Sequence, residues 1–273
     1  MSFDTRKALR IRSPTVEPRE YSALARVERE HWFYRGKRDL VRHWLNRLAS
    51  LGRDDLLIDV GAGTGQLLLE FRGSCRAIGI EHSPHGLEYA SQQPVELVRG
   101  SLDALPLAGD VASVVTALDV LEHVDDDERA FAELVRITRP RGLAIIHVPA
   151  FPMLWSDWDE SLGHKRRYTV PSLIRLANRF PVTIRRCVYV NTAAFPPVLF
   201  YRWLRRSFPG LLDRRLEDTL PPAPLNRLLH GLFVGPACWS WLSPPFGISI
   251  LCIIEKQVSS GTASKTSSSV RSS

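Results

Sequence analysis

The chain has 273 residues, four cysteines and a formal net charge of +7. Its length allows one large domain with an insertion. The basic residues are dispersed and no nucleic-acid-binding motif accompanies them, so nucleic acid is excluded as the expected partner. The cysteines lack the spacing of a metal or redox site, and the N-terminus is unlike a signal peptide. We therefore expect reduced thiols, no bound metal and a cytoplasmic protein.

Composition along the chain predicts the domain boundaries. Residues 1–19 are polar and rich in arginine, and residues 257–273 are rich in serine with almost nothing to bury. Such segments do not bury enough apolar surface to offset the entropy lost on ordering, so both ends are predicted to be disordered. A single domain is predicted over residues 20–256, with an apolar and basic insertion at 193–246.

Residues 28–48 place aromatic side chains just before a basic amphipathic helix. Trp32 and Phe33 stand at the start, and Arg35 and Arg38 follow. Two interpretations are open. The aromatic residues pack the helix against the domain, or they shield a bound ligand from water while an arginine holds a carboxylate.

The strongest signal is the run LLIDVGAGTGQLL at residues 56–68, in which a short apolar strand leads through Asp59 into a helical pattern. Three glycines alternate in the turn: Gly61, Gly63 and Gly65. Glycine is needed there because a tight strand-to-helix turn requires unusual backbone angles and brings the main chain against a ligand. A second apolar stretch ends at Glu81, whose carboxylate could accept both hydroxyls of a ribose. Together these features predict a pocket for an adenosyl cofactor.

The glycine spacing distinguishes between cofactors. A dinucleotide fold requires G-x-G-x-x-G, with the helix N-terminus at a pyrophosphate. This chain has Gln66 at the third glycine position. Asp59 would repel a phosphate but could hold an ammonium group through water. A nicotinamide-dependent reductase is therefore the less favoured alternative.

Strands and helices alternate after Glu81. A buried strand at 112–118 leads to Asp119, and a helix follows with acids in its first turn at 125–128 and Pro140 beyond its end. This alternation predicts an α/β fold with a parallel, doubly wound sheet. Ligands in such sheets bind at the carboxyl ends of the strands. The acids predicted at those ends are Asp59, Glu81, Asp103 and Asp119.

The segment after the fifth predicted strand, residues 155–173, contains the candidate catalytic residues. His164 could be a general base because imidazole titrates near neutral pH. Asp157 or Asp159 could serve instead. The segment lies where an acceptor substrate would enter above the cofactor pocket.

Basic residues in the same segment have two possible roles. Arg166 and Arg167, followed by Tyr168, could bind an anionic acceptor, since arginine forks suit phosphate and carboxylate groups. Alternatively, the two arginines tie the loop to its own acids, and Thr169 caps the next helix.

The insertion separates a sixth strand, at about 182–190, from a seventh that begins near Gly247. Its first helical segment puts basic residues on one face and aromatic and apolar residues on the other: Arg202, Arg205 and Arg206 against Phe200, Trp203 and Leu204. Such faces on one helix are typical of interfacial membrane binding. Peripheral membrane contact through 196–246 is therefore expected, with an apolar lid or a dimer surface as alternatives. Several prolines argue against a spanning helix.

In this order the motifs resemble those of the class I S-adenosylmethionine-dependent methyltransferases, over residues 28–192 and the last strand. The His-Trp-Phe segment at 31–33 and the loop 163–169 resemble a bacterial subgroup of that family. The resemblance implies a Rossmann-like sheet of seven strands and S-adenosyl-L-methionine as cofactor. The apolar helical insertion before the last strand is this chain's own departure, because the family joins the last two strands by a short hairpin. The implied cofactor contacts are Asp59, Gly61, Gly63, Gly65, Glu81, Ser101, Leu102 and Asp119. The substrate contacts expected beside them are Trp32, Arg35, Arg166, Arg167 and Tyr168.

One position departs from the family pattern. The family has an acid directly after the third strand that accepts the adenine amino group, and here Ser101 stands in that place, with Asp103 two residues on. Either the Ser101 hydroxyl or the main chain makes this contact, or Asp103 is a helix cap. The cap is the interpretation that we favour for Asp103.

The resemblance implies methyl transfer from S-adenosylmethionine, and the arginine pair favours an anionic acceptor. The predicted function is therefore O-methylation of a small anionic, sugar- or lipid-linked acceptor by in-line methyl transfer. The alternative is a non-catalytic S-adenosylmethionine-binding protein or a membrane-associated interaction protein. The expected location is the cytoplasm, at the inner face of the membrane. The oligomeric state stays open.

Overall fold

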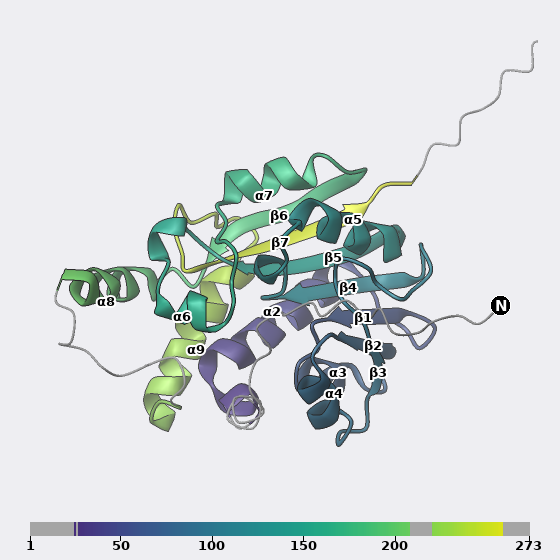
Figure 1. Cartoon of the computed structure of the whole chain (residues 1–273), viewed down its shortest axis with the longest axis horizontal. Helices are drawn as coiled ribbons and strands as arrows, with labels where there is room; N and C mark the ends of the chain where they lie inside the picture. Colours follow the sequence, from purple (N-terminus) through teal and green to yellow (C-terminus); the bar gives the residue numbers. More distant parts are fainter. Residues whose placement is uncertain (1–24, 26, 208–219, 259–273) are drawn as a thin grey trace, which may run out of the picture.

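A seven-stranded sheet forms the centre of the computed structural model, which describes residues 25, 27–207 and 220–258. The strand order is β3-β2-β1-β4-β5-β7-β6 (Figure 1). The strands are β1 (Leu56–Val60), β2 (Arg76–Glu81), β3 (Glu96–Arg99), β4 (Ala112–Leu118), β5 (Thr138–Pro149), β6 (Val182–Val190) and β7 (Ser249–Lys256). Strands β1 to β5 are parallel, and β7 runs antiparallel between β5 and β6. The predicted Rossmann-like methyltransferase sheet is confirmed.

Helices cover both faces of this sheet. They are α2 (Trp32–Leu48), α3 (Gln66–Phe71), α4 (Pro84–Ala90), α5 (Asp127–Ile137), α6 (Asp157–Ser161), α7 (Val170–Ala177), α8 (Phe195–Ser207) and α9 (Ala223–Cys238), with single turns η1 (Leu121–His123) and η2 (Pro152–Leu154). One core packs α5 and α7 on the sheet, and the other packs α2, α3 and α9 on its opposite face. Burial on both faces explains why the parallel strands are apolar without interruption.

Local signals set the helix boundaries near the site. Asp126 caps α5, and its side chain accepts a hydrogen bond from the Arg129 amide. Thr169 caps α7 as predicted, with its hydroxyl 3.2 Å from the Ser172 amide. The predicted cap at Asp103 is wrong, because Asp103 lies in a tight turn and no helix follows it. The two predicted disordered ends lie almost wholly outside the described residues.

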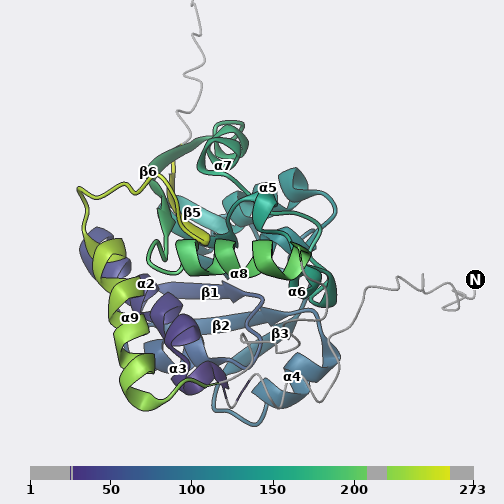
Figure 2. The same cartoon turned by 90° about the vertical axis from the view of Figure 1, so that its left-hand side faces the viewer.

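The described residues of the insertion form two helices that lie on different parts of the domain (Figure 2). Helix α9 packs along α2, where Phe233 is fully buried. Helix α8 contacts α6 instead, through an ion pair of 3.1 Å between Arg205 and Asp157. No described helix is long and apolar enough to cross a membrane. The insertion therefore adds α9 to the packed domain and places α8 beside residues 155–173, the segment where an acceptor is predicted to enter. We call this segment the acceptor loop.

The contact between α2 and α9 requires a glycine. A Cβ atom built on Gly36 would lie 2.4 Å from Cδ1 of Phe233, well inside van der Waals contact. No atom lies within 4 Å of a Cβ on Gly231, which is also helical but faces away. The close approach of the two helices thus depends on position 36.

We expect Gly36→Ala to lower the free energy of unfolding by about 1–3 kcal/mol, because the added methyl group overpacks the interface. Gly231→Ala is the matched control and should raise it by up to about 1 kcal/mol through helix propensity. Urea denaturation monitored by circular dichroism measures both. Equal effects of the two substitutions would show that the close packing against Phe233 is absent.

Candidate cofactor and acceptor site

The glycine-rich turn joins β1 to α3 as the sequence predicts. Gly61, Gly63 and Gly65 all have positive φ angles, of 74°, 53° and 79°. The amides of Gly61 and Ala62 donate to the carbonyl of Ile80, at 2.8 and 3.1 Å. The turn is therefore fastened to the end of β2, and a Cβ atom on Gly61 would lie 2.4 Å from Val120.

Glu81 joins this turn to the end of β2. One carboxylate oxygen accepts from the Gly63 amide and the other from the Ser83 amide, each at 2.8 Å. These two bonds orient the carboxylate at the turn, and each oxygen retains a lone pair for a further donor. This geometry suits the two hydroxyls of a ribose, the role that the sequence predicts for Glu81.

Two more carboxylates lie near Glu81, the buried Asp59 and the half-buried Glu28. Asp59 accepts a hydrogen bond of 2.6 Å from the Thr116 hydroxyl, and Glu28 accepts one from Thr64. Burial, with the charges of Glu28 and Glu81 adding to it, raises the pKa of Asp59 to about 7. Burial also raises the pKa of Glu28. Three clustered carboxylates suit a ligand with positive charge, which S-adenosylmethionine supplies at its ammonium and sulfonium groups.

Asp119 is paired with two basic side chains. Its oxygens lie 2.5 Å from Nζ of Lys37 and 2.6 Å from Nδ1 of His147. Burial by itself would raise the pKa of Asp119, but Lys37 and His147 outweigh it and hold that pKa below its usual range. Asp119 therefore faces the site as a carboxylate fixed by α2 and β5, at a positive φ of 57°.

Sequence reasoning missed three of these residues: Glu28, Lys37 and His147. Lys37 lies within the predicted amphipathic helix, where a lysine is ordinarily solvated, yet it is 8% exposed. His147 interrupts the apolar run of β5, and that interruption is the one signal that could have indicated it.

Ser101 and Leu102 follow β3, which pairs with β2 so that Arg99 stands opposite Glu81. Leu102 is buried, and Ser101 forms an isolated bridge with Ala104. Both lie near the end of the strand where the family holds adenine. Their contact with the cofactor stays a prediction.

The acceptor loop is organised around Asp159, which is fully buried. Its carboxylate lies 2.9 Å from Nδ1 of His164 and accepts two hydrogen bonds from the Arg167 guanidinium, at 2.7 and 3.0 Å. Burial would raise the pKa of Asp159, but His164 and Arg167 hold it below its usual range. Asp157 is largely exposed and pairs with Arg205. Among the three candidate bases, Asp159 is committed to His164 and Arg167, and Asp157 to Arg205. His164 uses Nδ1 for Asp159 and retains Nε2 for another partner.

Arg167 ties the loop to its own acid Asp159, as one alternative predicted, whereas Arg166 ties the loop to the start of α5 instead. Arg166 donates to the carbonyls of Val124 and Asp125 and pairs with Asp127 at 2.9 Å. The Tyr168 hydroxyl also donates to Asp127, at 3.0 Å. Arg167 holds Asp159, so an anion could reach it only if that pair opened. Acceptor binding by these residues stays a prediction.

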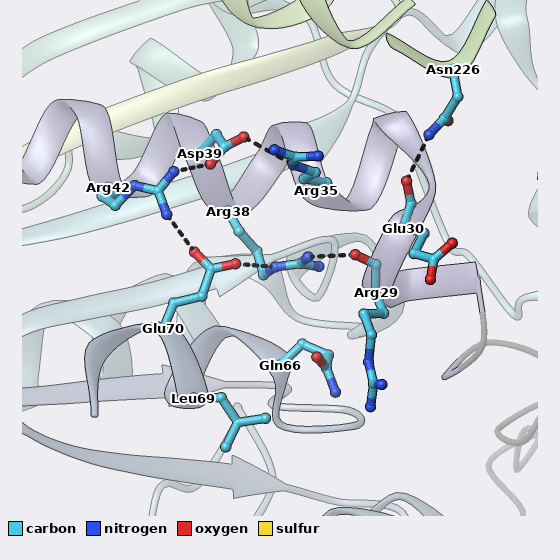
Figure 3. Close-up of a pocket in the computed structure, with 10 residues that line it drawn as sticks. All are labelled: Arg29, Glu30, Arg35, Arg38, Asp39, Arg42, Gln66, Leu69, Glu70 and Asn226. Carbon is cyan, nitrogen blue, oxygen red and sulfur yellow. Dashed lines mark hydrogen bonds and ion pairs between the residues drawn. The ribbon is translucent and has the colours of Figure 1, made fainter. Parts of the chain in front are cut away.

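Arg35 and Trp32 lie apart from this loop. Arg35 pairs with Asp39 in a charged surface cavity of about 520 Å³ lined by α2, α3 and α9 (Figure 3). Trp32 packs its ring edge against Phe233, and its amide donates to Asn226. Packing is thus the interpretation that the structure favours for Trp32.

Substitution of Gly63 tests the turn. We expect Gly63→Arg to abolish S-adenosylmethionine binding, because a long side chain there enters the predicted cofactor space. It also disturbs the hydrogen bond from the Gly63 amide to the Glu81 carboxylate. Gly73→Arg is the matched control, since Gly73 also has a positive φ, of 87°, and no atom within 4 Å of its Cβ position. Calorimetric titration should give no heat of binding for the first variant and wild-type affinity for the second. Retained binding by Gly63→Arg would refute this assignment.

Asp59 predicts a pH dependence. Below about pH 7 its carboxyl group is protonated in the free protein, so binding of a cationic cofactor must release that proton. The Kd should therefore rise by up to about tenfold per unit as the pH falls from 7 to 5. Calorimetry at pH 6 in buffers of different ionisation enthalpy measures the released proton. Asp59→Asn should bind more weakly and release none; equal proton release by both proteins would contradict the assignment.

Comparison with known proteins agrees with this geometry. A methyltransferase-domain family model matches residues 58–146, which run from β1 into β5. An uncharacterized methyltransferase of Mycobacteroides abscessus is 34% identical over 170 residues, covering 53% of this chain and 66% of that protein. One of Mycobacterium ulcerans is 37% identical over 113 residues, covering 40% and 44%. The chain thus matches less than half the length of the second relative.

Solved structures show the same fold. A chain in the complex between the Haloferax volcanii Trm112 methyltransferase activator and a methyltransferase has a TM-score of 0.59 and 16% identity, over 90% of this chain and all of that one. A Thermotoga maritima S-adenosylmethionine-dependent methyltransferase has a TM-score of 0.56 and 18% identity, over 88% and 96%. With the matched domain, the strand order and the carboxylate-lined glycine turn, the chain belongs to the class I S-adenosylmethionine-dependent methyltransferases.

Proposed function

We propose that this protein transfers the methyl group of S-adenosylmethionine to an oxygen atom of a small anionic acceptor that is linked to a sugar or a lipid. The observation that supports the proposal is the orientation of His164. Its Nδ1 is fixed by Asp159, and Nε2 points to the space beside Glu122, 3.9 Å away. An imidazole held by a buried carboxylate in this way is suited to take a proton from a hydroxyl group.

The proposed methyl transfer forms one bond, breaks one bond and moves one proton. The acceptor oxygen forms a bond to the methyl carbon while the carbon–sulfur bond breaks, and its electron pair stays on sulfur to give S-adenosylhomocysteine. The hydroxyl proton passes to Nε2 of His164. The sulfonium methyl is already activated, so in-line positioning supplies most of the rate, up to roughly 7–11 kcal/mol in favourable cases.

The nature of the acceptor is inferred from the surroundings of the loop. Arg166 keeps 31% of its side chain exposed, which leaves it able to meet an anionic group. Helix α8 lies next to the loop, with Phe200 and Trp203 exposed by 61% and 56%. Arg202 and Arg205 turn inward instead, toward Asp159 and Asp157 of α6. An outward aromatic face favours a lipid-linked acceptor and contact of residues 196–246 with a membrane surface.

Methyl transfer can be measured with labelled S-adenosylmethionine and separate membrane-lipid and sugar-phosphate extracts. We expect label in the lipid fraction, and we expect His164→Gln to lower kcat by about 10²–10⁴-fold without changing the cofactor Kd. His230→Gln is the matched control, because His230 also pairs with an aspartate, at 2.7 Å, but on the contact between α2 and α9. Cofactor binding with no labelled product in any extract would favour the non-catalytic alternative.

A further inference from the structure

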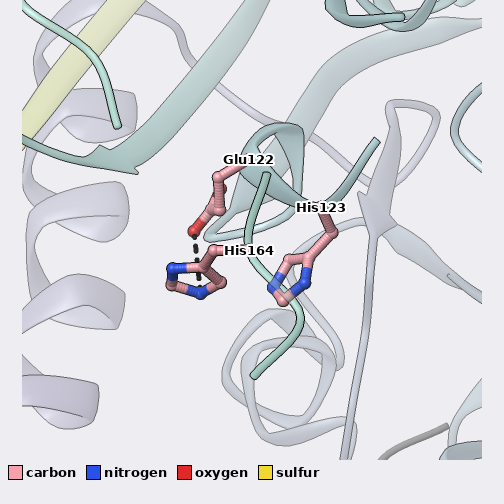
Figure 4. A group of neighbouring side chains, drawn as sticks. All are labelled: Glu122, His123 and His164. Carbon is pink, nitrogen blue, oxygen red and sulfur yellow. Dashed lines mark ion pairs between the residues drawn. The ribbon is translucent and has the colours of Figure 1, made fainter. Parts of the chain in front are cut away.

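Three side chains with metal-binding atoms converge beside the acceptor loop. Glu122 and His123 belong to η1, directly after β4 and Asp119, and His164 comes from the loop after α6 (Figure 4). A carboxylate oxygen of Glu122 and one ring nitrogen of each histidine all lie within 4.8 Å of one another. The site is therefore assembled from two segments that are distant in the sequence.

Glu122 is the unusual member of this group. Its side chain is fully buried, and neither carboxylate oxygen has a hydrogen-bond partner among the described residues. A buried carboxylate without partners is strongly unfavourable, and native proteins rarely leave such a group unsatisfied. Nε2 of His164 lies 3.9 Å from a carboxylate oxygen of Glu122. A cation between the two would satisfy both.

His164 already has the support that a metal ligand needs. Nδ1 of His164 is held by Asp159, which is itself fixed by Arg167. Metal-binding histidines use one ring nitrogen for such a partner, which fixes the tautomer and leaves the lone pair of the other nitrogen free. The His123 ring lies nearly perpendicular to the His164 ring, with their centroids 4.7 Å apart.

We infer that Glu122, His123 and His164 bind a divalent transition-metal ion of the zinc class. Two imidazoles and one carboxylate are a typical ligand set for catalytic zinc, with the fourth position open. Tetrahedral zinc ligands stand roughly 3.3 Å apart, because each bond is about 2.0–2.1 Å. The group must close by roughly 1.5 Å at its widest separation, which side-chain rotation of Glu122 and the histidines can supply.

The role of this ion rests on the proposed function and deepens it. The open position faces the acceptor side of the site, where a hydroxyl oxygen could bind the ion and lose its proton to water. Metal coordination lowers the pKa of a bound hydroxyl, as it does for bound water. With the metal bound, Nε2 of His164 would be a ligand, so the ion would generate the nucleophile. Direct proton transfer to Nε2 would then belong to the metal-free protein.

The test uses untagged full-length protein, stripped with a chelator and titrated with Zn²⁺ against a chromophoric competitor. We expect one bound zinc per chain. Glu122→Gln and His164→Gln should each weaken binding by more than the about 10–100-fold expected for Asp159→Asn, which only orients a ligand. Cobalt substitution should give visible absorption bands that disappear in Glu122→Gln.

His85→Gln is the matched control, because His85 also lies near a glutamate, 3.9 Å from Glu88, without a third ligand. It should bind zinc as the wild type does. Circular dichroism identifies any variant that fails to fold, and Glu122→Gln keeps the shape of the side chain, so at least one ligand variant remains interpretable. Absence of stoichiometric zinc in the wild type, or equal affinity in Glu122→Gln and His85→Gln, overturns the site.

Titration of the same preparations with S-adenosylmethionine, together with the labelling assay, separates this inference from the proposed function. A protein that binds zinc through these residues but transfers no methyl group would retain the metal site and lose the function. Methyl transfer by a wild type that binds no zinc would do the reverse, with His164 as the direct base.

Discussion

The burial of carboxylates at the carboxyl edge of the parallel strands is the constraint on which this structure depends. Asp59, Glu81, Asp119 and Glu122 are all placed there by the ends of β1, β2 and β4. Buried carboxylates repel one another and lose their hydration, so each requires a donor, a cation or a proton. The helices and loops around this edge are arranged to meet that requirement, and the groups left incompletely satisfied indicate where ligands bind.

The protein's own cations satisfy only part of this edge. Lys37 reaches Asp119 from α2, and Arg167 holds Asp159 in the acceptor loop. The carboxylates near the glycine turn receive hydroxyl and amide donors instead, which leaves negative charge for a cationic cofactor. Glu122 receives none within the described chain. The pairing of these carboxylates thus distinguishes two regions. One is the predicted cofactor region at the glycine turn, and the other is the acceptor side around Glu122, where we infer a metal ion.

The insertion before β7 supports both regions by different means. Helix α9 is part of the core, because Phe233 fills the space that Gly36 leaves on α2, and α2 in turn places Lys37. Helix α8 contacts the acceptor loop through Arg202 and Arg205 and exposes Phe200 and Trp203. These two arginines of the expected basic face therefore pair with acids of the protein.

The sequence by itself determined the sheet, the glycine turn and the placement of Asp59, Glu81 and Asp119, because strand and turn signals are local and parallel strands bring their ends together. It also determined the cap at Thr169. The local sequence pattern wrongly predicted that Asp103 caps a helix, because the structure has a tight turn at this position. Only the tertiary structure decided the roles of Lys37, His147 and Glu28, the commitment of Arg167 to Asp159, and the meeting of His123 with His164. Those roles depend on contacts between segments that are distant in the chain, and the spacing of residues in the sequence does not record such contacts.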